Sequence, residues 1–209
     1  MRARPRIVAS LLLFIALAPV VTGCFRRQFP ERRLFVLNVE RTEVARSPSS
    51  AVVRVGRVRA EPQYERKGFV YRTGDSTFAD DFYNAFYVSP AQMVRSTMHE
   101  WLAASGMFTL VADVDSLVGA DWLLESRLMD FYLDKRVDGE ARAVVRLAVT
   151  LVDARKSPPS ARLERTYEET VNAASGGQGY VDAWSVALAR VFARMEADLA
   201  ATLASRKAP

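Results

Sequence analysis

Residues 141–151 read ARAVVRLAVTL, and this stretch decides the fold class. Every odd-numbered position is apolar, whereas Arg142 and Arg146 fall on even positions. A period of two is typical of a β-strand with one buried face. Residues 122–134 precede this strand with a similar pattern, and Asp138-Gly139 between them is a hairpin turn signal. The sequence therefore predicts a long β-hairpin.

Two helices are expected beside the strands. Ser89 is a suitable N-cap, Pro90 occupies the first helical position, Gln92 completes a capping box and Gly106 ends the helix. The C-terminal segment has apolar residues every three or four positions, which indicates one long buried helical face. These residues are Val181, Trp184, Leu188, Val191, Met195, Leu199 and Leu203.

The order of elements predicts a single three-layer α/β domain over residues 51–205, with a mixed or largely antiparallel sheet covered by two main helices. Further strands are expected at residues 51–59, 69–72, 108–111 and 163–169, with a short first strand at 34–37. Residues 24–50 are interpreted as a tether, and the glycine-rich run 176–179 as a flexible hinge.

The N-terminus has the pattern of a lipoprotein signal peptide. Three arginines precede an apolar run at residues 7–21, which is shorter than the ~20 residues of a membrane-spanning helix. Residues 21–24 read VTGC and resemble the bacterial lipobox. We expect cleavage after Gly23 and lipid modification of Cys24, because a thiol is the nucleophile that this acylation needs and Cys24 is the only cysteine. Residues 1–23 are then the signal peptide.

Location and charge follow from this interpretation. Phe25 stands where an Asp would favour inner-membrane retention, so the periplasmic face of the outer membrane is expected, with the acyl chains on Cys24 as the anchor. The net charge of +5 includes the three signal-peptide arginines, and the remaining charges are interleaved. The basic balance is therefore no evidence for nucleic-acid binding.

Residue sets that support catalysis are scarce in this sequence. His99 is the only histidine and is expected to be a surface or packing residue, because the sole cysteine is assigned to lipid. A zinc site needs three or four nitrogen or sulfur ligands, which the chain does not offer. The acidic pairs Asp80-Asp81 and Glu168-Glu169 are interpreted as solvated. We therefore predict no catalytic, cofactor-binding or metal site, and no enzymatic activity.

Residues 78–88 read FADDFYNAFYV and are unusually aromatic. The spacing of four places Phe82 and Phe86 on one helical face, with Tyr83 and Tyr87 beside them. Two interpretations stay open, a buried core segment and a partly exposed platform for a protein partner or a lipid. We predict that the two phenylalanines are structural and that Tyr83 and Tyr87 include contact residues.

Three segments resemble one known family. Residues 60–72 read AEPQYERKGFVYR, residues 81–86 read DFYNAF and residues 101–108 read WLAASGMF. In this order, behind a lipobox, they resemble the ABC-type transport auxiliary lipoproteins over roughly residues 50–203. The resemblance implies a three-layer α/β fold without catalytic residues. It also implies an outer-membrane role in a mammalian-cell-entry (MCE) type system that moves lipids between the membranes.

The partners implied by the resemblance are an MCE-domain protein and, through it, an inner-membrane ABC ATPase and permease. Direct phospholipid contact and a homo-oligomer stay open. The alternative is an outer-membrane lipoprotein that docks or activates cell-wall enzymes, and loss of cell-wall synthesis rather than of the lipid barrier would distinguish it.

Overall fold

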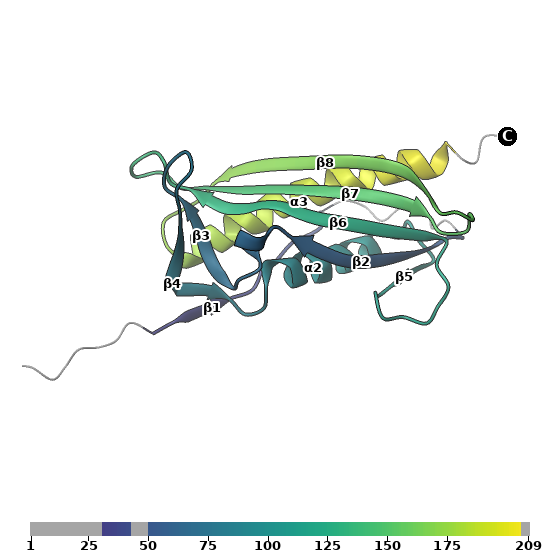
Figure 1. Ribbon diagram of the computed structural model, residues 1–209, viewed down its shortest axis with the longest axis horizontal. Helices are drawn as coiled ribbons and strands as arrows, with labels where there is room; N and C mark the ends of the chain where they lie inside the picture. Colours follow the sequence, from purple (N-terminus) through teal and green to yellow (C-terminus); the bar gives the residue numbers. More distant parts are fainter. Residues whose placement is uncertain (1–30, 43–49, 206–209) are drawn as a thin grey trace, which may run out of the picture. The chain divides into compact units, whose positions relative to one another are not determined.

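Strand β6 organises the sheet in the computed structural model, which describes residues 31–42 and 50–205. β6 (Trp122–Asp134) pairs along its whole length with β7 (Arg142–Asp153), and β7 pairs with β8 (Ser160–Asn172). Both pairings are antiparallel, so the predicted hairpin is confirmed as the long central part of the sheet in Figure 1.

The other edge of β6 is shared by two shorter strands. β2 (Val52–Ala60) runs parallel to the first half of β6, and β3 (Gly68–Arg72) runs parallel to its end. The one-turn helix η2 (Pro62–Tyr64) separates them, and its Tyr64 is buried against Tyr132. β2 and β3 therefore act as one interrupted strand along β6.

Three outer strands complete an eight-stranded mixed sheet. β5 (Leu110–Ala112) adds to β2 in parallel. β4 (Phe78–Phe86) adds to β3 in antiparallel orientation, and β1 (Arg33–Phe35) lies parallel to β4. The predicted mixed α/β class is confirmed.

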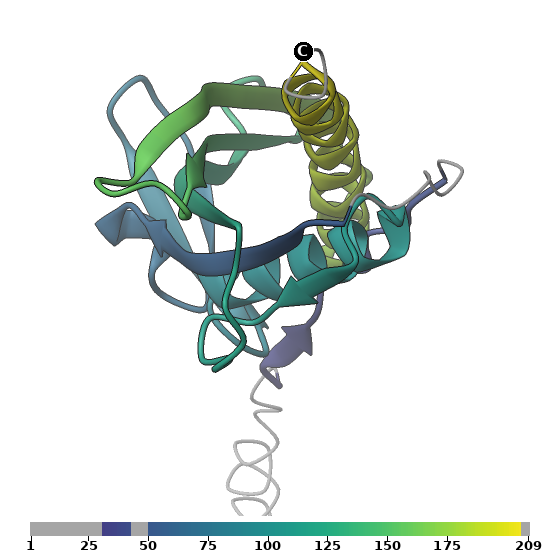
Figure 2. The same ribbon diagram turned by 90° about the vertical axis from the view of Figure 1, so that its right-hand side faces the viewer.

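Both helices lie on the same face of the sheet. α2 (Pro90–Ser105) packs on β2, and α3 (Gly177–Ala204) packs on β7 and β8. Figure 2 shows the strands bending into an arc, with α3 across its open side. The described residues thus form one sheet layer and one helix layer, where the sequence suggested three layers. In this part of the chain, neither helix combines the length and apolar character that a bilayer span requires.

The caps and core agree with the helical periodicities. Ser89 accepts a hydrogen bond from the Gln92 amide, and Gly106 ends α2 with a left-handed φ of 67°. In α3, Trp184 is fully buried, and its ring stacks on Phe131 with the centroids 5.0 Å apart. Aromatic packing from both layers therefore holds α3 on the sheet.

The run 176–179 is not the hinge that was expected. Gly177 is buried in the first turn of α3, and a Cβ atom there would lie 2.6 Å from the Phe35 ring. A Cβ atom on Gly179 would lie 2.5 Å from the carbonyl oxygen of Ala174. These two glycines allow close packing at the start of α3, since no side chain fits there.

The expected tether over residues 24–50 is also too long. Residues within it form β1 and bury Leu37. Arg41 makes a bidentate ion pair with Glu196 of α3, at 2.8 and 3.1 Å, and Trp101 of α2 donates to the same carboxylate at 2.8 Å. The packed domain therefore begins near Arg33, while Gly23 and Cys24 lie outside the described residues.

Candidate functional site

The aromatic segment forms strand β4, so the helical face predicted for it does not exist. Phe86 is 1% exposed and packs against Phe69 and Trp184, as its predicted structural role requires. Phe82 is 79% exposed, which contradicts the same prediction for that residue. The reason is an irregularity of the strand that includes Phe82 and ends before Phe86.

A bulge at residues 81–84 interrupts the pairing of β4 with β3. On β4, Asp80 pairs with Val70 and Ala85 pairs with Gly68. The four residues 81–84 therefore lie opposite the single residue Phe69 of β3. Bulges of this kind re-aim side chains and are common beside functional sites. Here the bulge turns Phe82 and Tyr83 towards solvent.

Asp81 holds the bulge in shape. Its Oδ1 accepts hydrogen bonds from the amides of Tyr83, at 2.7 Å, and Asn84, at 3.0 Å. Its Oδ2 accepts from Asn84 Nδ2 at 2.6 Å and from the Tyr71 hydroxyl. Burial alone would raise the pKa of Asp81, but the hydrogen bonds from Asn84, Tyr71 and the two amides outweigh it and hold the pKa below its ordinary value.

This network corrects the interpretation of the acidic pair Asp80-Asp81. Asp80 is exposed and faces Arg66 at 3.5 Å, as a solvated residue would. Asp81 is instead a partly buried acceptor that determines local backbone shape. Asp side chains often accept a hydrogen bond from the backbone amide two residues further on, as Asp81 does from Tyr83, and this tendency is the local signal that could have identified it.

Tyr71 connects the bulge to α3 and to the end of β6. Burial, with the hydrogen bond to Asp81, raises the pKa of the Tyr71 hydroxyl, so it stays protonated and donates. Its ring meets Tyr180 edge-on with the centroids 6.2 Å apart, and Lys135 Nζ lies 4.2 Å from the Tyr71 ring centroid. The bulge is therefore fixed on three elements of the domain.

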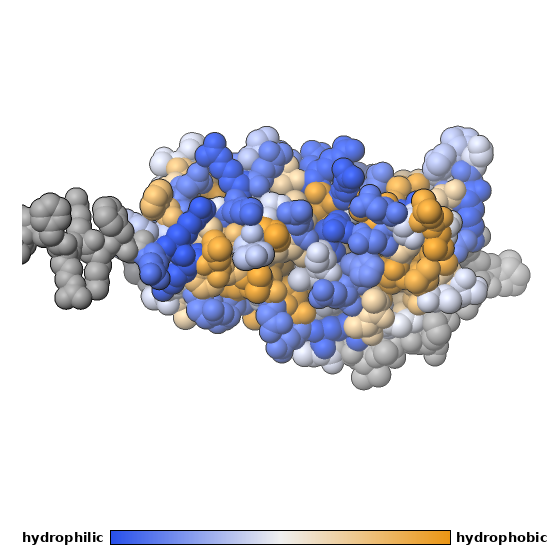
Figure 3. All heavy atoms as spheres, turned by 90° about the horizontal axis from the view of Figure 1, so that it is seen from below, coloured by the Kyte–Doolittle hydropathy of each residue, from blue (hydrophilic) through white to orange (hydrophobic). Residues whose placement is uncertain are grey.

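Exposed apolar side chains lie along the paired strands β1 and β4, or directly after them. Phe82 and Tyr83 form an edge-to-face pair with ring centroids 5.3 Å apart. We name this group the aromatic patch, and all its members are 45–79% exposed along the β1–β4 edge. They are Leu34, Val36, Phe82, Tyr83 and Tyr87. Figure 3 shows that apolar surface on the underside lies in separate areas among polar side chains.

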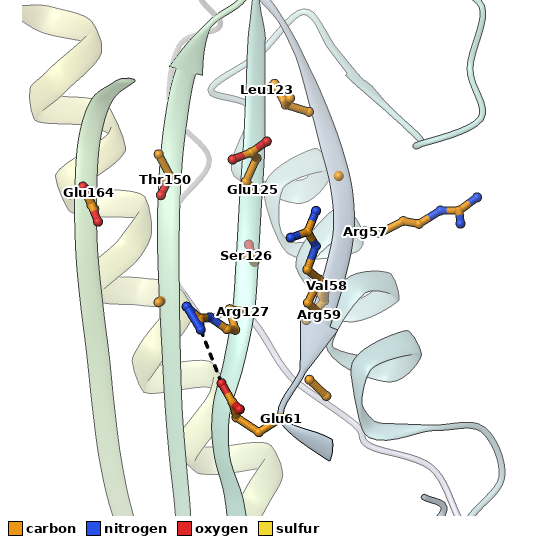
Figure 4. A pocket seen from close by; sticks show the side chains of 13 residues that line it. Arg57, Val58, Arg59, Glu61, Leu123, Glu125, Ser126, Arg127, Thr150 and Glu164 are labelled. Carbon is orange, nitrogen blue, oxygen red and sulfur yellow. Dashed lines mark ion pairs between the residues drawn. The ribbon is translucent and has the colours of Figure 1, made fainter. Parts of the chain in front are cut away.

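A second candidate is a hollow of about 890 Å³ on the face of the sheet away from the helices. It is lined by β2, β6 and β7 near the β2 irregularity around Gly56. Arg127 pairs with Glu61 at 3.5 Å, and Figure 4 shows Arg57 pointing away from the other lining side chains. Charges of both signs around an open floor fit a solvated sheet face better than a binding pocket.

The other candidate residues from the sequence, His99 and Glu169, make contacts that connect elements of the fold. His99 Nε2 lies 3.1 Å from the Val111 carbonyl oxygen, so this side chain links α2 to β5, as a packing residue does. Glu169 pairs with Arg194 of α3 at 2.9 Å. Within residues 31–42 and 50–205, no group of three or more metal-ligating side chains comes together.

The family of this chain follows from its similarity to known proteins. A family model described as "ABC-type transport auxiliary lipoprotein component" matches residues 35–196. The chain belongs to this family. The resemblance in the three segments is thereby confirmed, and membership of a lipoprotein family indicates a membrane-anchored location in the cell envelope. No curated protein sequence matches the chain.

Solved structures support the fold of this auxiliary lipoprotein. A DUF330 protein from Xanthomonas campestris superimposes with a TM-score of 0.75 at 16% identity, covering 85% of this chain and all of that one. A hypothetical protein from Chlamydia trachomatis gives a TM-score of 0.50 at 13% identity, covering 72% of this chain and 96% of that one. At such identities the likeness concerns the fold alone.

Two of the three segments that carry the family resemblance, residues 60–72 and 81–86, contribute to the bulge and its surroundings. Tyr64 fills the gap between β2 and β3, Tyr71 bonds Asp81, and residues 81–86 form the bulge and its buried end. Residues 101–108 instead end α2 with Trp101 against Glu196. Tyr83 and Tyr87 are both exposed, as a contact role requires, and that role stays a prediction.

Proposed function

We propose that this auxiliary lipoprotein is a non-enzymatic docking component of an MCE-type ABC system that moves lipids between the inner and outer membranes. It is anchored through acyl chains on Cys24, at the periplasmic face of the outer membrane. The signal pattern before Cys24, with Phe25 after it, supports this location. Its direct protein partner is an MCE-domain protein, which connects it to the inner-membrane ATPase and permease.

The observation that carries this proposal is the aromatic patch on a hydrogen-bonded bulge. Exposed Phe and Tyr side chains supply apolar contact area, and Asp81 fixes the backbone before any contact forms. Pre-organisation lowers the entropy lost on binding. Such a surface suits attachment, and the sequence offers one histidine and no free thiol for nucleophile–base chemistry.

The test combines anchoring with co-purification. Cys24→Ser should abolish lipid labelling and leave uncleaved precursor, whereas His99→Ala should label, fold and function like the wild type. The lipidated protein should co-purify with the MCE-domain protein, and its deletion should weaken the outer-membrane lipid barrier. Deletion that stops cell-wall synthesis and leaves the lipid barrier intact would contradict the proposal and favour a cell-wall docking role.

A further inference from the structure

We propose that Phe82 and Tyr83 lie in the headgroup region of the same membrane leaflet that holds the lipid anchor. Phe82 and Tyr83 would then form a second, non-covalent membrane contact that orients the domain and leaves other exposed residues of the aromatic patch, Tyr87 among them, to the protein partner. This inference rests on the proposed acylation of Cys24, and it adds the identity of the surface that these two side chains touch.

The path of the chain into β1 is the first argument. β1 runs parallel to β4 with Arg33 opposite Asn84. In a parallel pair, residues that precede Arg33 approach residues that precede Asn84. The segment from the anchor therefore joins the domain beside the bulge that carries Phe82 and Tyr83, at the β1 end of the molecule in Figure 1.

The length of that segment is the second argument. Cys24 and Arg32 are eight positions apart in the sequence, which spans at most ~28 Å when fully extended. An acylated Cys24 lies at the membrane surface, so the bulge cannot move farther from the bilayer than about that distance. Within such a short reach a tethered group meets the surface at an effective concentration on the order of millimolar, so even a weak contact is populated.

The chemistry of this end is the third argument. Aromatic side chains with an apolar ring are enriched at membrane–water interfaces, and a tyrosine adds a polar tip that bonds headgroups. Phe82 is 79% exposed and Leu34 is 54% exposed, so both can enter the interface without unfolding. Arg26, Arg27 and Arg33 lie in or beside the connecting segment. Basic residues near an anionic membrane surface are attracted to it, which favours the same orientation.

The opposite end of the domain supplies a matched control. Leu117, in the loop between β5 and β6, is fully exposed and apolar. That loop lies at the far end of the sheet from β1 and β4 in Figure 1. Arg54 fixes it by donating to the carbonyl oxygens of Ser116 and Val118. If exposure alone brought side chains to a membrane, Leu117 would behave like Phe82.

The experiment uses the full lipoprotein in vesicles of phosphatidylethanolamine and phosphatidylglycerol. Because Cys24 is the only cysteine and would be acylated, Phe82→Cys and Leu117→Cys each offer one thiol for an environment-sensitive fluorophore. We expect the label at position 82 to shift to the blue and to be quenched by lipid-borne quenchers. The label at position 117 should keep the emission of an aqueous probe.

Three outcomes would overturn the inference, and they differ in what they say of the proposed function. Aqueous emission at both positions, in protein whose mass confirms acylation, removes the membrane contact and leaves the docking function intact. Shielding at position 82 only after the MCE-domain protein is added makes the patch a protein contact. A mass without acyl chains contradicts the inference and the proposed anchoring together.

Discussion

The middle and the C-terminal end of strand β4 place the same residue type in opposite environments. Phe86 is 1% exposed among Phe69, Phe131 and Trp184, whereas Phe82, four positions earlier, is 79% exposed beside Tyr83. Regular periodicity would have given the two rings equivalent positions on one face. The bulge at residues 81–84 separates them, so a backbone irregularity decides which ring belongs to the core and which to the surface.

The largest expected effect concerns the buried ring. Phe86→Ala should lower the free energy of unfolding by about 3–5 kcal/mol, because it leaves a cavity between the sheet and α3. Phe82→Ala should lower it by less than about 0.5 kcal/mol, as surface substitutions usually do. Urea unfolding followed by circular dichroism measures both values. Equal losses in the two variants would show that Phe82 is also core.

The next largest effect concerns Asp81, whose carboxylate holds the bulge in shape. Asp81→Asn should lower the free energy of unfolding by about 1.5–3 kcal/mol at neutral pH, because it replaces an ionised acceptor of several hydrogen bonds. Phe82 and Tyr83 should also become more mobile. Asp80→Asn is the matched control, since Asp80 has a single exposed ion pair with Arg66, and it should change the stability little.

The same pair of variants gives a pH dependence with a definite sign. The folded state lowers the pKa of Asp81, so the stabilisation is present above the unfolded pKa of ~4 and is lost as the pH falls through the folded pKa. The difference in stability between wild type and Asp81→Asn should therefore shrink below about pH 4. A difference that stays constant down to acid unfolding would mean that Asp81 is not an ionised acceptor.

A smaller effect is expected where α3 meets the β1–β4 edge. Gly177→Ala places a Cβ atom 2.6 Å from the Phe35 ring and 2.8 Å from Asn84 Oδ1. Overpacking costs about 1–3 kcal/mol, and the higher helix propensity of Ala offsets at most about 1 kcal/mol of this. Thermal unfolding measures the result against Gly119→Ala, whose Cβ would meet nothing within 4 Å. A variant at 177 as stable as this control would restore the hinge interpretation.

The smallest effect on stability belongs to the exposed tyrosines. Tyr83→Ala and Tyr87→Ala should each change the free energy of unfolding by less than about 0.5 kcal/mol. Tyr83→Ala should nevertheless weaken the membrane contact of the bulge, which weaker quenching of the fluorophore at position 82 by lipid-borne quenchers would detect in the acylated protein. If both variants unfold the domain as strongly as Phe86→Ala, the exposed platform does not exist.

The sequence by itself determined the elements whose signals are local or periodic. Alternation over residues 141–151 fixed the central hairpin, and Ser89 with Gly106 set the ends of α2 to within one residue. The spacing from Val181 to Leu199 identified the buried face of α3. Such patterns are readable because backbone geometry repeats along the chain, so each residue reports on its neighbours.

Only the tertiary structure decided the candidate site. The bulge exists because β3 and β4 shift register and because Tyr71, ten positions before Asp81, donates to its carboxylate. Gly177 is buried because α3 packs against β1, far earlier in the sequence. Neither contact leaves a periodic trace in the chain, because each is set by how separate elements meet in space. The exposure of Phe82 is therefore a property of the folded domain rather than of its local sequence.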